Sequence, residues 1–129
     1  MNSEIFSIEN ASTGDYRTFK LETQPEDATF AAGNTILSLL IGRTEYKSFA
    51  FCGEHKGFFC VHAWKRFKDT EFENLGGLVA AVIDGGGQYT TASGAEYRRV
   101  DAVACSRCGE MLTRPDSIRK GIGPICETY

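Results

Sequence analysis

Three cysteines near the C-terminus, Cys105, Cys108 and Cys126, have the residue type and spacing of metal ligands. Two cysteines separated by two residues can turn both sulfurs towards one ion, and the backbone N–H groups of such a turn stabilise the thiolates. Gly109 follows the pair directly and suits the tight turn, because glycine tolerates a positive φ. A closed structural zinc site takes four ligands. The spacing therefore predicts a zinc module with Cys126 as the third ligand.

The segment between the cysteine pair and Cys126 has the residues needed to bring the chain back to the metal. Residues 115–120 can form about one helical turn, since proline is tolerated at a first helical position and Gly121 can end the turn. A module this small has almost no core, so metal binding would supply much of its folding free energy. A redox pair normally opens a helix in a thioredoxin-like βαβ unit, which is absent here. Inert thiols are the remaining alternative.

The same segment resembles a known family. Its pattern, C-x-x-C-G-x-x-L-T-x-P-x-S-I-x-x-G-I-G-P-x-C, is similar to a cysteine module of bacterial and phage proteins classified as a domain of unknown function, DUF6011. Besides the cysteines, the similarity uses Leu112, Thr113, Pro115, Ser117, Ile118, Gly121, Ile122, Gly123 and Pro124. Residues 24–27 and 64–67 more loosely resemble the part that precedes this module. The resemblance implies a zinc module and a phage or mobile-element background, and it implies no reaction.

The fourth zinc ligand is not evident, because residues 105–129 contain no further cysteine or histidine. The other strong ligands are Cys52, His55, Cys60 and His62. His55 falls in an expected hairpin turn, where it is either a ligand or an exposed turn residue. Cys60 and His62 lie two apart on one strand face, which suits a pair of ligands, but a cysteine among aromatic residues is more often a small core residue. Cys52 has the same core interpretation, and an Asp, a Glu, water or a partner thiol could also complete the site.

Composition and charge limit the class of protein. A chain of 129 residues with 42% hydrophobic residues suggests one compact domain with a real core. Its net charge of −3 gives no global attraction to nucleic acid or anionic lipid. The start lacks the features of a signal peptide, and the apolar runs 36–41 and 78–83 are too short to span a membrane. Five cysteines cannot all pair within one chain. We expect a soluble, cytoplasmic protein with no membrane partner.

Alternating apolar and polar residues predict two β-hairpins. The first joins residues 6–10 and 16–22, and the second joins 48–53 and 58–64. A buried strand is expected at 35–41, with loops at 24–28 and 42–47. If Gly53 pairs with Phe58, one face of the second hairpin carries Phe49, Phe51, Cys60, His62 and Trp64, and the other carries Cys52, Phe59, Val61 and Ala63.

A helix is expected over about residues 70–84. Thr70 and Glu73 have the spacing of a capping box, and apolar residues then recur every three or four positions, at Phe72, Leu75, Val79 and Val82. Gly76 and Gly77 each make the helix less stable by roughly 1 kcal/mol, which weakens the prediction. Residues 85–87 are all glycine and are expected to end the helix. Residues 88–95 read as a loop and 97–104 as a strand. The fold class is thus α+β: residues 1–100 form a small antiparallel sheet with one packing helix, and residues 101–129 form a zinc knuckle with a short helix.

Residues 64–68, Trp-Lys-Arg-Phe-Lys, interleave aromatic rings with cations, as single-strand binders do. Lysine and arginine stems that lie beside a buried Trp64 explain the same pattern. The zinc module is only slightly basic, with four basic and three acidic residues in 105–129. Two histidines and no triad signature argue against an enzyme. We expect a non-enzymatic protein of a phage or mobile element that binds a host macromolecule. A host protein is favoured by the acidic charge, and nucleic acid bound by residues 64–68 and the module is the alternative.

Overall fold

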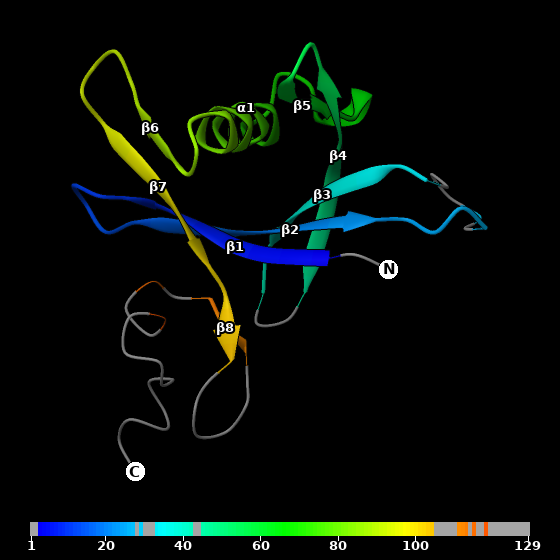
Figure 1. The fold of residues 1–129 in the computed structure, drawn as a ribbon, viewed down its shortest axis with the longest axis horizontal. Coiled ribbons are helices and arrows are strands. Elements are labelled where there is room, and N and C mark those ends of the chain that lie inside the picture. Colours follow the sequence, from blue (N-terminus) through cyan, green and yellow to red (C-terminus); the bar gives the residue numbers. More distant parts are fainter. Residues whose placement is uncertain are drawn as a thin grey trace.

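A seven-stranded antiparallel sheet with one helix on one face makes up most of the computed structural model, which describes residues 3–27, 29, 33–42, 45–104, 111–113, 115 and 118 (Figure 1). The strand order is β5-β4-β3-β2-β1-β7-β6, and β8 and β9 form a separate two-stranded ladder. The elements are β1 (Ser3–Asn10), β2 (Tyr16–Thr23), β3 (Thr35–Leu40), β4 (Tyr46–His55), β5 (Phe58–Ala63), the 3-10 helix η1 (Lys65–Phe67), α1 (Glu71–Asp84), β6 (Gln88–Thr90), β7 (Glu96–Asp101), β8 (Val103–Ala104) and β9 (Met111–Leu112). The α+β class and the antiparallel sheet are confirmed.

The helix α1 begins and ends where the sequence predicts. The Thr70 hydroxyl accepts a hydrogen bond from the N–H of Phe72 at 3.3 Å, and Gly85 follows as the C-terminal cap. Val79 and Val82 are fully buried against the sheet. Gly76 is buried too, and a Cβ atom there would lie 2.9 Å from Cγ1 of Val61 on β5. Glycine at this position therefore lets the helix approach the strand closely.

The core lies between α1 and the sheet face that α1 covers (Figure 1). Alternate residues of the central strands point into it because successive side chains of a strand face opposite sides. The fully buried large side chains are Phe6, Phe19, Leu37, Phe49, Val79 and Val82. Phe67 of η1 joins this cluster and is 8% exposed.

The second hairpin differs from its predicted register. Gly53 pairs with Cys60 instead of Phe58, and His55 pairs with Phe58 across the two-residue turn Lys56–Gly57. Both turn residues have a positive φ, 52° and 83°, as the common two-residue hairpin turn requires. The shift is two residues, and two residues is the period of side-chain alternation. The predicted faces are therefore kept.

Phe49 is the exception to those faces. The pairing of β3 with β4 passes from Leu37–Ala50 to Ser38–Ser48, so Phe49 has no partner and forms a bulge. The bulge turns Phe49 towards α1, where its ring lies 5.2 Å from that of Phe72. The prediction that Phe49 shares a face with Phe51 was wrong, because the extra residue breaks the alternation.

Three further boundaries differ from the sequence prediction. Residues 46 and 47, expected in a loop, belong to β4, and Ile41, expected in a strand, lies just beyond β3 with 52% of its surface exposed. Residues 88–90, also expected in a loop, form the edge strand β6. All three residues of β6 are exposed, so no buried face marks them as a strand. The strand expected at 97–104 is found as β7, paired with β1, and β8.

The described part of the C-terminal segment contacts the sheet face away from α1. The Ser7 hydroxyl donates a hydrogen bond to the Thr113 carbonyl, and Leu112 is 6% exposed. Pro115 and Ile118 are helical, in agreement with the predicted helical turn. Cys105, Cys108 and Cys126 lie outside the described residues, as does most of the predicted zinc knuckle. In the part of the chain that is described, no helix has the length and apolar character needed to cross a membrane.

Candidate binding groove

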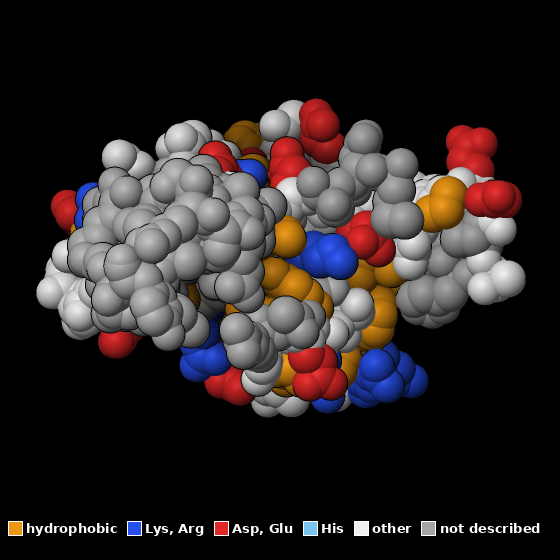
Figure 2. Space-filling view, turned by 90° about the horizontal axis from the view of Figure 1, so that it is seen from below, with side chains coloured by type: hydrophobic (Ala, Val, Ile, Leu, Met, Phe, Trp, Pro, Cys, Tyr) orange, Lys and Arg blue, Asp and Glu red, His pale blue; other side chains and the backbone are white. Residues whose placement is uncertain are grey.

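The β4–β5 hairpin presents one face to α1 and the other away from it. Phe51 and His62 form one cross-strand pair of the outer face, and Gly53 and Cys60 form the next. The helix covers only the inner face, because α1 packs on Val61 and Phe49. On the side of the molecule opposite α1, hydrophobic side chains reach the surface between charged ones (Figure 2). The outer face of the hairpin is where the structure places two of its hollows.

The larger hollow is a groove of about 790 Å³ where β5 ends and η1 begins. Its lining residues are Phe51, His62, Ala63, Trp64, Lys65, Arg66 and Lys68. Trp64 links the two elements: its N–H donates to the Phe49 carbonyl at 2.8 Å, and its extended backbone leads the chain into η1. The buried Phe67 anchors η1 in the core. The segment 64–68, identified from the sequence, is thus fixed at both the strand and the core.

Aromatic rings and cations alternate along this groove. The rings of Phe51 and Trp64 lie 5.4 Å apart at 56°. The Arg66 guanidinium lies 5.6 Å from the centre of the Trp64 ring and 4.8 Å from that of Phe67. Lys65, Arg66 and Lys68, here called the basic cluster, are all exposed, whereas Trp64 is half-buried. The groove can therefore offer an aromatic surface to a flat ring and positive charge to an anion.

The smaller hollow, here called the hairpin hollow, adjoins the groove. Gly53, Glu54, His55, Cys60 and His62 line its volume of about 400 Å³. Three of the four candidate zinc ligands in the body thus lie together on the outer face: His55 and His62 are exposed, and Cys60 is half-buried. The core interpretation of Cys60 was therefore wrong. No group of three or more His, Cys, Asp or Glu side chains is arranged to hold a metal ion among the described residues.

Cys52 lies on the opposite, inner face of the hairpin. It pairs with Val61 and packs against the core, as the sequence suggested. Burial raises the pKa of the Cys52 thiol to about 12. The thiolate, the form that metals bind, is therefore harder to form at Cys52 than at an ordinary thiol, which disfavours Cys52 as a metal ligand.

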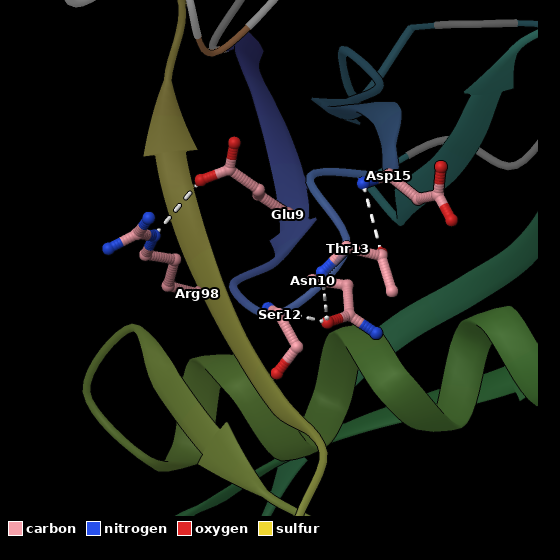
Figure 3. A network of polar contacts seen from close by, with 6 residues as sticks. All are labelled: Glu9, Asn10, Ser12, Thr13, Asp15 and Arg98. Atoms are coloured by element: carbon pink, nitrogen blue, oxygen red, sulfur yellow. Dashed lines mark hydrogen bonds and ion pairs between the residues drawn. The ribbon is translucent and has the colours of Figure 1, made fainter.

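A polar network at the β1–β7 pairing, away from the β4–β5 hairpin, was not predicted from the sequence (Figure 3). The guanidinium of Arg98 on β7 donates to the carboxylate of Glu9 at 3.0 Å, and the Glu9 side chain is only 4% exposed. In the adjoining turn, the Asn10 side-chain oxygen accepts from the N–H groups of Ser12 and Thr13. These bonds fix the β1–β2 turn and the β1–β7 pairing. The network is therefore structural and is separate from the groove.

Comparison with known protein families finds a match for the C-terminal segment but not for the groove. Residues 102–129 match the model of DUF6011, a family of unknown function. The resemblance of the cysteine segment to this family is thereby confirmed. The match begins directly after β7 and does not include the groove. No curated protein and no solved structure gave a significant match.

Proposed function

We propose that this chain is a non-enzymatic binding protein that holds single-stranded nucleic acid in the groove between β5 and η1. The observation that carries this proposal is the combination, in one groove, of the aromatic residues Phe51 and Trp64 with the basic cluster. Single-strand binders combine stacking rings with cations that follow the backbone. A positively charged groove without aromatic rings in its lining would suit many anions, whereas this arrangement favours a strand whose bases are free to stack.

From the sequence, the net charge of −3 favoured a protein over nucleic acid as the partner. The positive charge of the groove itself favours nucleic acid instead. Charges farther away than a Debye length, about 8 Å at physiological ionic strength, are largely screened from a ligand. Three exposed cations line the groove itself. A host protein is therefore the second candidate partner, and it becomes the preferred one if the nucleic-acid experiment fails.

Titration of the protein with labelled single-stranded oligonucleotides tests the proposal directly. Trp64 is the single tryptophan of the chain, so its fluorescence reports on the groove alone. Contacts of the basic cluster with three phosphates predict a slope of about −2 for the logarithm of the binding constant against the logarithm of salt concentration. The Arg66→Gln variant should reduce that slope by about 0.7.

Lys20→Gln is the matched control for Arg66→Gln. Lys20 lies on β2, three strands away from β5 and thus about 14 Å distant across the sheet. It should leave both the affinity and the salt dependence unchanged. Absence of binding to single- or double-stranded DNA or RNA at low salt would refute the proposal, and equal losses in both variants would place the strand elsewhere.

We further propose that Cys105, Cys108 and Cys126 hold one structural zinc ion. The donor set supports this, because three thiols at this spacing suit zinc. When bound, zinc would tie the two ends of the segment together and supply folding free energy to it. A phage or mobile-element origin, which the resemblance of the cysteine segment implies, and action in the cytoplasm are part of this proposal.

Metal analysis of the purified protein tests the zinc proposal. We expect one zinc ion per chain, lost in Cys126→Ser and kept in Cys52→Ala, whose thiol lies in the core. Loss of zinc in either Cys60→Ser or His55→Ala would identify the fourth ligand. A parent protein that contains no metal and has freely reactive thiols at Cys105 and Cys108 would show that the proposal is wrong.

A further inference from the structure

The hairpin hollow and the groove share His62, so they form one continuous surface along the outer face of β4 and β5. Three cross-strand pairs follow one another on this face: Phe51–His62, Gly53–Cys60 and His55–Phe58. The two outer pairs carry aromatic rings and the middle pair carries small residues. Each step along the strands is two residues, so the aromatic pairs lie about 13 Å apart.

The small middle pair creates the hollow. Gly53 has no side chain, and a Cβ atom built there would meet nothing within 4 Å. The Cys60 thiol donates to the carbonyl of Phe58 at 3.6 Å, so it lies along its own strand and does not fill the space opposite. The resulting volume of about 400 Å³ is within the range of small-molecule sites, about 300–1,000 Å³.

The chemistry of the hollow differs from that of the groove. No lysine or arginine lines it, so it does not suit a phosphate as the groove does. His55 and His62, which lie on the outer face, instead supply hydrogen-bond groups that can meet the edge of a base. At the far end, Phe58 is 63% exposed, which packing does not explain. An exposed ring is expected where a second ring stacks on it.

We infer that the hairpin hollow is a base-binding subsite of the same nucleic-acid path. The phosphates of the strand lie along the basic cluster, and the strand continues past His62 so that one further base enters between the two aromatic pairs. This inference rests on the proposed function, because it extends the strand that the groove holds. It adds a position where a base is held by its edge, since the hollow offers two imidazoles as hydrogen-bond groups.

Two substitutions test the subsite without altering the groove. Gly53→Val fills the hollow with a residue that strands favour, at a position with free space. Phe58→Ser removes an exposed ring, and Tyr89→Ser on β6, at the opposite edge of the sheet and 38% exposed, is its matched control. The probes are oligothymidylate and oligocytidylate of about 4 and about 12 nucleotides, which span the site sizes of single-strand binding folds.

We expect Gly53→Val and Phe58→Ser each to weaken binding of the long oligonucleotides about tenfold, the effect of one lost stacked base. Binding of the short oligonucleotides and the quenching of Trp64 should be unchanged, as should all binding by Tyr89→Ser. Gly53→Val should weaken binding of the long oligocytidylate and of the long oligothymidylate alike, because it fills the space that a base of either kind would enter. Unchanged affinity for long oligonucleotides in both variants would overturn the subsite and leave the groove intact. Absence of any oligonucleotide binding by the parent would overturn the proposed function itself, and the subsite with it.

Discussion

Two adjacent glycines of α1 allow the packing of the helix on the hairpin to be measured. Gly76 is buried and faces β5, whereas Gly77 is exposed. A Cβ atom at Gly76 would lie 2.9 Å from Cγ1 of Val61 and 3.8 Å from Cε2 of Phe49, while one at Gly77 would meet nothing within 4 Å. Replacing each glycine by alanine therefore makes the same chemical change at a crowded and at an open position.

The expected stabilities follow from two opposing effects. Alanine in a helix interior is more favourable than glycine by about 0.8–1 kcal/mol, which should appear in full in Gly77→Ala. In Gly76→Ala the same gain is offset by overpacking, which typically costs about 1–3 kcal/mol because Val61 is β-branched and stiff. We expect Gly76→Ala to be less stable than Gly77→Ala by about 1–3 kcal/mol, a quantity from which helix propensity cancels.

Urea unfolding followed by circular dichroism measures this difference. The midpoint should rise in Gly77→Ala and fall or stay level in Gly76→Ala, with the same slope in both. In a Val61→Ala background, Gly76→Ala should cost less stability than it does in the parent protein. The methyl group of Val61 that crowds the new Cβ atom is already absent there. Equal stabilisation by the two single substitutions would refute the close approach of α1 to β5.

Two other predictions concern the sheet and its core. Ser7→Ala removes the hydroxyl that donates to the Thr113 carbonyl and bonds to the Thr18 hydroxyl at 2.7 Å. This substitution should lower the unfolding free energy by about 1–3 kcal/mol, because buried groups are left without a partner. Ser12→Ala, at an exposed position, should change the urea midpoint little. The thiol of Cys52, with its pKa raised from 9.0 to about 12, keeps its proton in the folded state after the unfolded state has lost it. Its stabilising contribution is thus complete below about pH 9 and falls as pH rises towards 12, with a slope below the ideal 1.4 kcal/mol per pH unit because the group is partly exposed; urea unfolding across this range should show a weaker pH dependence in Cys52→Ala.

Local patterns predicted most of the fold. The helical stripe of α1 and its Thr70 cap, and the alternation in both hairpins, are short-range signals that burial then reinforces. The bulge at Phe49 has no such signal, since its residues remain apolar and β-forming on either side. Strand β6 was missed because its partner β7 lies across a turn and neither face of β6 is buried. Both the bulge and strand β6 depend on which residues of neighbouring strands pair, and a short stretch of sequence does not specify that pairing.

The candidate site was predictable only where its residues are close together in the sequence. The segment 64–68 was recognisable because its aromatic and basic residues are consecutive. The hairpin hollow was not, because it depends on which residue of β4 lies opposite Cys60. The two residues Lys56 and Gly57 did carry the relevant signal, since a two-residue turn with glycine second is typical of a tight hairpin. That turn alone places His55 opposite Phe58 and Gly53 opposite Cys60.

The bulge at Phe49 explains how one hairpin serves both the core and the groove. With strict alternation, Phe49 and Phe51 would share the outer face, and the space beneath α1 would lose a large side chain. The extra residue turns both Phe49 and Ala50 inward, where each is 0% exposed, and leaves Phe51 facing outward beside Trp64. The Phe49 carbonyl also receives the N–H of Trp64, which directs the chain into η1. The irregularity that fills the core is therefore also the feature that positions the aromatic wall of the groove.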